Sequence, residues 1–193
     1  MPSTMPYAVL LRGINVGGNN RLPMADLRAL LTDLGCTEVA TYLQSGNAVV
    51  SAPAAGPAAL AADLERALDV SAGLSIRVLV RSRDELAGLV AGNPMPAAAA
   101  DGSRYFVTFL DGPAEPDRLT GVDPQRYAPD RFAVAGREIY LWCPAGLSDS
   151  ELPKVFSDRR LGVTTTTRNW NTVTRLLAMA GGAANPAPIK EKG

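Results

Sequence analysis

The apolar residues in the first half of the chain alternate between short strand-like runs and helical spacing. Over residues 23–34 and 57–68 they recur at three- and four-residue intervals, which is the pattern of an amphipathic helix with one buried face. Apolar runs of strand length occupy residues 7–12, 38–43, 47–51 and 75–81. The element order predicted for this half is therefore β-α-β-β-α-β.

The second half of the chain repeats this order after a further predicted helix at residues 82–91. Strands are predicted at residues 104–110, 131–135, 138–143 and 163–167, and helical segments near 115–120, at 148–159 and at 169–180. Ser148 and Glu151 have the spacing of a capping box at the start of the helix over 148–159. The pattern predicts an α+β protein of two tandem ferredoxin-like units, each with an antiparallel sheet, followed by a C-terminal helix.

The composition between the two halves indicates a boundary. Residues 92–102 contain two prolines and four consecutive alanines, a composition typical of a linker. We therefore predict a first unit over residues 1–91, a linker over 92–102 and a second unit with the C-terminal helix over 103–180. Residues 181–193 are predicted to be a loose tail.

Several classes of function are excluded by composition. The chain has no histidine, which rules out Ser-His-Asp and Cys-His catalysis and histidine-ligated metals. Its two cysteines, Cys36 and Cys143, lack C-x-x-C spacing and are expected to be buried reduced thiols. There is neither an apolar run of about 18 residues nor a signal-peptide pattern, so we expect a cytoplasmic protein without a membrane partner.

Charge is informative in its distribution. The formal net charge is zero, so no overall field attracts the protein to nucleic acid. Residues 101–158 carry six basic and ten acidic residues, a net charge of −4, whereas residues 159–193 carry six basic and one acidic, a net charge of +5. An anion site is best sought in that last stretch.

Three polar segments interrupt the apolar pattern, and two of them are expected to meet. The first, the N-terminal loop (residues 12–20), stands between a strand and a helix, where glycines let backbone N–H groups approach an anion. It has neither the P-loop nor the dinucleotide-binding motif. The second, the hairpin turn (residues 44–47), enters the third strand. Because the first and third strands run antiparallel side by side in this fold, Arg12 should lie within reach of the hairpin turn.

The third polar segment, the C-terminal polar segment (residues 164–172), precedes the last helix. Asn169 is a plausible N-cap, and Trp170 either anchors the helix or stacks on a ligand ring beside Arg168. We expect this segment to face the other two across the domain interface and to complete one polar cleft. The alternative is that the loops only cap one another. The candidate ligand-binding residues are Arg12, Asn15, Gly17, Gly18, Gln44, Ser45, Asn47, Arg168, Asn169, Trp170 and Asn171.

These segments also carry a family resemblance. The runs LLRGINVGGNNRLPMADLRALLTDLG, TYLQSGNAVV and TTRNWNTVTRLL resemble the hallmarks of the bacterial family catalogued as domain of unknown function 1697. The resemblance covers nearly the whole chain. It implies a two-part α+β fold built from ferredoxin-like units, and it implies no activity, ligand or catalytic residue.

The leading functional hypothesis is a protein that binds a small anionic or nucleotide-like ligand in this cleft. Whether it is also an enzyme stays open; chemistry there would rest on positioning and charge stabilisation by Arg12 and Arg168. No metal or cofactor is expected, since the three polar segments contain no carboxylate. One alternative is nucleic-acid binding on a platform of Tyr105, Phe109, Tyr140 and Trp142, which the net charge of −4 around it disfavours. Another is an interaction or scaffold protein without a small ligand. The oligomeric state is left open.

Overall fold

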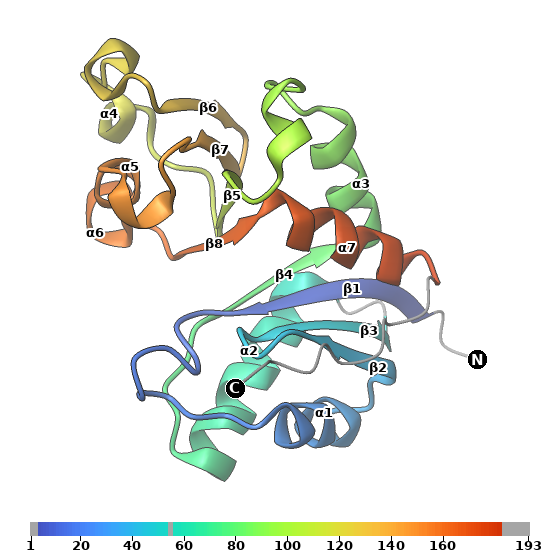
Figure 1. The fold of residues 1–193 in the computed structure, drawn as a ribbon. Coiled ribbons are helices and arrows are strands. Elements are labelled where there is room, and N and C mark those ends of the chain that lie inside the picture. Colours follow the sequence, from blue (N-terminus) through green and yellow to red (C-terminus); the bar gives the residue numbers. More distant parts are fainter. Residues whose placement is uncertain (1–3, 54–55, 183–193) are drawn as a thin grey trace, which may run out of the picture. The chain divides into compact units, whose positions relative to one another are not determined.

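The first sheet and its two helices are formed by residues near the N-terminus. In the computed structural model, which describes residues 4–53 and 56–182, these elements follow the predicted order (Figure 1). They are β1 (Thr4–Leu11), α1 (Met24–Asp33), β2 (Thr37–Tyr42), β3 (Asn47–Pro53), α2 (Pro57–Ala72) and β4 (Val78–Ser82). The strands pair antiparallel in the order β2-β3-β1-β4.

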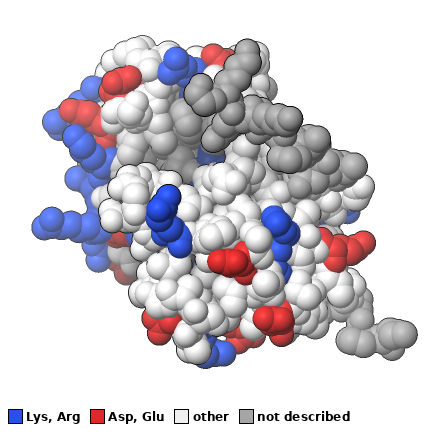
Figure 2. Space-filling model, turned by 60° about the horizontal axis from the view of Figure 1, so that its bottom comes forward, with Lys and Arg blue, Asp and Glu red and all other residues white. Residues whose placement is uncertain are grey.

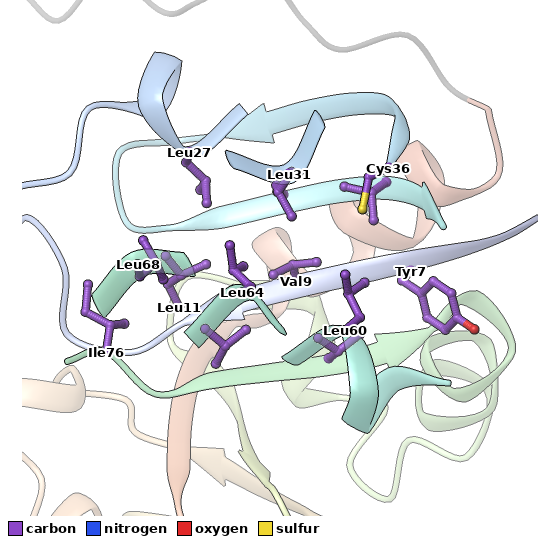
Figure 3. Close-up of a cluster of buried hydrophobic side chains, with 14 of the residues drawn as sticks. Tyr7, Val9, Leu11, Leu27, Leu31, Cys36, Leu60, Leu64, Leu68 and Ile76 are labelled. Atoms are coloured by element: carbon purple, nitrogen blue, oxygen red, sulfur yellow. The ribbon is translucent and has the colours of Figure 1, made fainter. Parts of the chain in front are cut away.

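The core of this unit lies between one face of the sheet and the helices α1 and α2. Both helices present buried leucines to it, at Leu27 and Leu31 in α1 and at every fourth residue of α2 (Figure 3). Alternate residues of β1 face these leucines, among them Val9 and Leu11 (Figure 3). The apolar residues that recur every three to four positions in the helices and every two positions in the strands thus form one apolar layer.

The second unit repeats the strand arrangement, and the helices between its strands are short. After α3 (Arg83–Ala91) and a 3₁₀ helix at Ala98–Asp101, its strands are β5 (Tyr105–Leu110), β6 (Arg131–Ala135), β7 (Glu138–Trp142) and β8 (Thr165–Asn169). Its helices are α4 (Pro116–Leu119), α5 (Leu152–Val155), α6 (Asp158–Leu161) and the first part of α7 (Trp170–Ala180), with 3₁₀ turns at Pro124–Tyr127 and Leu147–Asp149. The sheet order, β6-β7-β5-β8, is equivalent to that of the first sheet, and every pairing is antiparallel. The prediction of two tandem ferredoxin-like units is confirmed.

One helix prediction is wrong. Residues 148–159 form a 3₁₀ turn and the two short helices α5 and α6 instead of a single helix. Pro153 explains the break between the 3₁₀ turn and α5, because proline inside a helix removes a backbone donor and clashes with the preceding turn. The capping box of Ser148 does not form; Ser150 Oγ instead accepts a hydrogen bond from the backbone N–H of Leu152 at 3.1 Å.

The chain divides into two compact units, residues 1–87 with 175–193 and residues 88–174, so it crosses between them within α3 and again within α7. The predicted linker, residues 92–102, lies inside the second of these units and includes the 3₁₀ helix at Ala98–Asp101. Within the described residues, α7 ends in a turn at Gly181 and Gly182, and residues 183–193 of the predicted tail lie outside them. In the same described part of the chain, no helix combines the length and apolar character that a membrane span needs.

Candidate ligand-binding loops

The N-terminal loop and the hairpin turn lie at the same end of the first sheet. The antiparallel register of β1 and β3 pairs Leu10 with Asn47, and the backbone N–H of Leu11 donates to Gly46 O at 2.8 Å. The next residue, Arg12, donates its backbone N–H to Arg77 O at 2.9 Å, which places it at the same end. The two loops therefore meet at one end of the sheet, as expected, and the reach of the Arg12 side chain to the hairpin turn stays a prediction.

Asn15 joins the two loops through its side-chain amide. Its Nδ2 donates to Gln44 O at 2.7 Å and to Leu22 O at 3.0 Å, while its Oδ1 accepts from Leu22 N at 2.9 Å. The backbone of Asn15 is left-handed, with φ of 54°, a conformation that asparagine tolerates better than most residues. Asn15 therefore closes its own loop and fixes the hairpin turn against it.

Asn47 fastens the hairpin turn from the inside. It is fully buried, and its Nδ2 donates to Tyr42 O and to Ser45 Oγ, both at 3.0 Å. Gly46, beside it, has φ of 78°, and a Cβ at this position would lie 2.7 Å from Ile14 Cδ1. The side-chain amides of Asn15 and Asn47 thus hold the loops together. This is the alternative role stated above for these segments, in which the loops cap one another.

The other candidate residues of the two loops are exposed to solvent. Arg12, Gly17, Gly18, Gln44 and Ser45 are exposed. Figure 1 shows the segment between β1 and α1 extending past the end of the sheet. On the face shown in Figure 2, acidic and basic side chains are interspersed over a mostly uncharged surface, so attraction of a charged ligand depends on local groups.

Two apolar side chains are also exposed on these loops. Val16 is 65% exposed and Leu43 is 48% exposed, and they adjoin Asn15 and Gln44, the residues whose hydrogen bond joins the loops. Leu43 has φ of 57°, which is an outlier for a bulky residue. Leu43 lies in the turn between β2 and β3, so the turn sets its backbone conformation. Residues held in such strained conformations cluster at active sites and ligand clamps.

The C-terminal polar segment belongs to the second unit. Arg168 donates to Thr166 Oγ1 at 2.8 Å and to Thr167 O at 2.9 Å, and burial lowers its pKa to about 10. Asn169 Oδ1 accepts from Thr172 N at 2.9 Å, which confirms it as the N-cap of α7. Asn171 is exposed, and its side chain lies against Gly102. That this segment faces the first two stays a prediction.

Trp170 lies in an aromatic cluster of the second unit. It is only 7% exposed, and the centroid of its ring is 5.1 Å from that of Tyr105 and 6.5 Å from that of Tyr140. The hydroxyl of Tyr105 donates to Asn93 Oδ1 at 2.6 Å, and that of Tyr140 donates to Leu89 O at 2.8 Å. These two tyrosine rings are core residues and do not form the exposed stacking platform considered for nucleic acid.

The tyrosines of this cluster make the stability of the second unit sensitive to alkaline pH. Burial raises the pKa of Tyr140 from 10.0 to about 12, and burial also raises the pKa of Tyr105. Above the unfolded-state pKa the unfolded chain loses these protons before the folded chain does, so the free energy of unfolding falls as pH rises. We expect Tyr140 alone to account for a loss of about 2 kcal/mol between pH 10 and pH 12, measured by urea denaturation.

The matched variants separate this effect from general alkaline damage. Tyr140→Phe should be less stable by about 1 kcal/mol near neutral pH, because Leu89 O loses its donor. It should also lose less stability than the unmodified protein as pH rises. Tyr127→Phe, at a half-buried tyrosine outside the cluster, should keep the full alkaline loss. An unchanged alkaline loss in Tyr140→Phe would contradict the assignment.

Neither cysteine chemistry nor a metal centre is indicated in the described part of the chain. Cys36 and Cys143 are buried and free, and burial raises the pKa of both thiols, which disfavours the reactive thiolate. Among the described residues no group of three or more histidine, cysteine, aspartate or glutamate side chains is placed to hold a metal ion.

The N-terminal loop (residues 12–20) and the hairpin turn (residues 44–47) together form a polar double loop at one end of the first sheet. The fold is that of a tandem ferredoxin-like α+β protein. Residues 5–140 match the family described as "Protein of unknown function (DUF1697)", and the chain belongs to this family. It is similar in structure to a conserved bacterial protein, SP0830, from Streptococcus pneumoniae, with a TM-score of 0.70 and 23% sequence identity over 92% of this chain and 99% of that chain. At this identity the likeness shows the fold alone. No curated protein matches this chain.

Proposed function

We propose that the N-terminal loop and the hairpin turn bind a small anionic or nucleotide-like ligand. The observation that carries this proposal is the hydrogen bond of 2.7 Å from Asn15 Nδ2 to Gln44 O. It holds two exposed loops, 29 residues apart in sequence, in one arrangement. A binding surface fixed before the ligand arrives loses less conformational entropy on binding.

An anion is the ligand that the chemistry of these loops favours. Residues 12–21 contain two arginines, Arg12 and Arg21, and no carboxylate, and the hairpin turn has none either. Gly17 and Gly18 both have positive φ, with values of 60° and 80°, and a Cβ at either would meet nothing within 4 Å. Both glycines are exposed, so an oxyanion can reach the backbone there, and guanidinium groups bind phosphate and carboxylate strongly.

The exposed apolar residues extend this argument to a nucleotide-like ligand. Val16 and Leu43 adjoin the residues that join the loops, and Leu43 keeps a strained backbone while its side chain stays half exposed. A base carries an apolar face that can cover such side chains while its phosphates contact Arg12. Asn15 and Asn47 are then positioning residues, and Arg12, Gly17, Gly18, Gln44 and Ser45 are the residues expected to touch the ligand.

Arg12→Ala tests this proposal directly. Removing a charge-assisted hydrogen bond to phosphate costs about 1.5–3 kcal/mol, which corresponds to roughly 10- to 150-fold in Kd. We expect a loss of this size for ATP and for inorganic phosphate in isothermal titration calorimetry. Because Arg12 is exposed, the unliganded protein should change in stability by less than about 0.5 kcal/mol.

The control is Arg126→Ala, which removes the same charge from an exposed arginine of the second unit. It should leave both affinities within about twofold of the unmodified protein, because Arg126 belongs to neither of the two loops. If ATP and phosphate do not bind the unmodified protein, or if they bind Arg12→Ala and Arg126→Ala equally, the double loop is not an anion site.

A further inference from the structure

A hollow in the first unit lies away from the double loop. It has a volume of about 460 Å³ and includes Thr4, Pro6 and Ser51 in its lining. Val9 and Leu11 of β1 face α1 and α2, so the alternation along β1 turns Thr4 and Pro6 to the opposite face of the sheet. The strand register places Thr4 and Ser51 at one end of the sheet and the Leu10–Asn47 pair, beside the hairpin turn, at the other.

The lining of this hollow is mainly apolar, with one charged residue. Apolar contacts come from Pro6, Ala40, Val49, Met179 and Ala180, the last two at the end of α7 beside β1 (Figure 1). Among the described residues that line it, only Glu38 carries a charge. The hydroxyl of Ser51 donates to Glu38 Oε2 at 2.5 Å and holds the carboxylate at the hollow. The hollow therefore holds the Glu38 carboxylate in a fixed orientation beside a mainly apolar surface.

The backbone at Glu38 is costly for a glutamate. Thr37 pairs with Ser51 and Ala40 pairs with Val49, so β2 has one residue more than β3 between these pairs and forms a β-bulge. Glu38 has φ of 51°, the left-handed conformation that glycine takes in bulges of this type. A bulge protects an edge strand such as β2 from pairing with other chains, but glycine would serve that purpose with less strain. The bulge alone does not explain the carboxylate.

We propose that this hollow binds an organic cation, with the Glu38 carboxylate contacting an ammonium group and the apolar wall covering an alkyl portion. Ser51 occupies Oε2, so Oε1 is the atom directed to the ligand. An ammonium beside a carboxylate on an apolar wall is less screened than in water, which favours a charged ligand over a neutral one of the same shape. The ligand has the opposite charge to that proposed for the double loop, and the two sites do not depend on each other.

Hexylammonium is a suitable probe for the full-length protein, because it combines one ammonium with a short alkyl chain. Titration followed by backbone amide chemical shifts should give saturable changes at Thr4, Ser51 and Gly182, which line the hollow. Hexanol and hexanoate, which share the alkyl chain, should bind about tenfold more weakly or not at all. Saturable shifts confined to the double loop, or equal binding of hexanol, would overturn the proposal.

Two substitutions at Glu38 separate ligand contact from fold. Glu38→Gln keeps the shape and should weaken hexylammonium binding at least about tenfold, while ATP binding at the double loop stays unchanged. Glu38→Gly removes the carboxylate and the backbone strain together, so it should lose binding and raise the melting temperature. Asp33→Asn, an exposed carboxylate at the end of α1, is the charge-matched control and should retain binding. Retained binding in Glu38→Gln, or a lower melting temperature in Glu38→Gly, would refute the assignment.

Discussion

Replacing Trp170 with alanine should lower the free energy of unfolding by about 3–5 kcal/mol, the usual cost of truncating a buried aromatic residue. The indole is 7% exposed and packs against Tyr105 and Tyr140. Its removal would leave a cavity between two rings whose hydroxyl groups are held by hydrogen bonds to Asn93 and Leu89. Because those rings are held in place, we expect little collapse into the cavity. Urea denaturation followed by circular dichroism measures the loss.

Two further variants make this prediction specific. Trp170→Phe keeps a ring in the cluster and should cost less than Trp170→Ala, because the cavity is smaller. Val134→Ala, at a residue of β6 that is 39% exposed, should cost less than about 1 kcal/mol. A loss of less than about 1 kcal/mol in Trp170→Ala would contradict the packing role and restore the indole as a candidate for ligand contact.

Gly46→Ala should destabilise the first unit by about 2–5 kcal/mol and disturb the double loop. Its φ of 78° costs an L residue about 1–2 kcal/mol. The new Cβ would also lie 2.7 Å from Ile14 Cδ1 and 2.8 Å from Leu11 Cβ. Overpacking of this kind adds about 1–3 kcal/mol. Because Ile14 belongs to the N-terminal loop, relief of the clash has to move the two loops apart.

Gly18→Ala is the matched control for this substitution. Gly18 has φ of 80°, so its backbone strain equals that of Gly46, but a Cβ there would meet nothing within 4 Å. Gly18→Ala should therefore lower the free energy of unfolding only by the cost of the left-handed backbone, about 1–2 kcal/mol. The difference between the two variants, measured by thermal or urea unfolding, isolates the contact between the loops. Equal losses would show that the loops do not depend on this close approach.

Much of the fold could be predicted from local pattern. Leu60, Leu64 and Leu68 recur every fourth residue, and the helix found there presents all three to the core. The glycine of the hairpin turn has the positive φ that its turn chemistry predicted. Where two local signals competed, at Pro153, apolar spacing favoured one long helix, but the proline separates the 3₁₀ turn at Leu147–Asp149 from α5.

The candidate sites depended more on contacts between distant residues. Asn15 and Asn47 were recognisable as polar loop residues, but their amides serve the loops themselves. Nothing in the pattern around Glu38 singled it out, since one glutamate at the start of an edge strand is ordinary. Only the extra residue in β2, the hydroxyl of Ser51 and the end of α7 together place its carboxylate at a hollow.

The sequence by itself determined the order of elements, the repetition of a ferredoxin-like unit and the meeting of two loops at one sheet edge. Helical spacing, strand alternation and turn chemistry are local, and antiparallel pairing in this fold then places the loop ends. Only the tertiary structure decided which polar and aromatic side chains pack or form hydrogen bonds within the protein and which face outward. Asn15 reaches a carbonyl 29 residues away, and Trp170 at the start of α7 packs against rings of β5 and β7. The partners of a buried ring or a hydrogen-bonding amide are residues that folding brings together from distant parts of the chain. The local sequence pattern around each residue does not identify these partners.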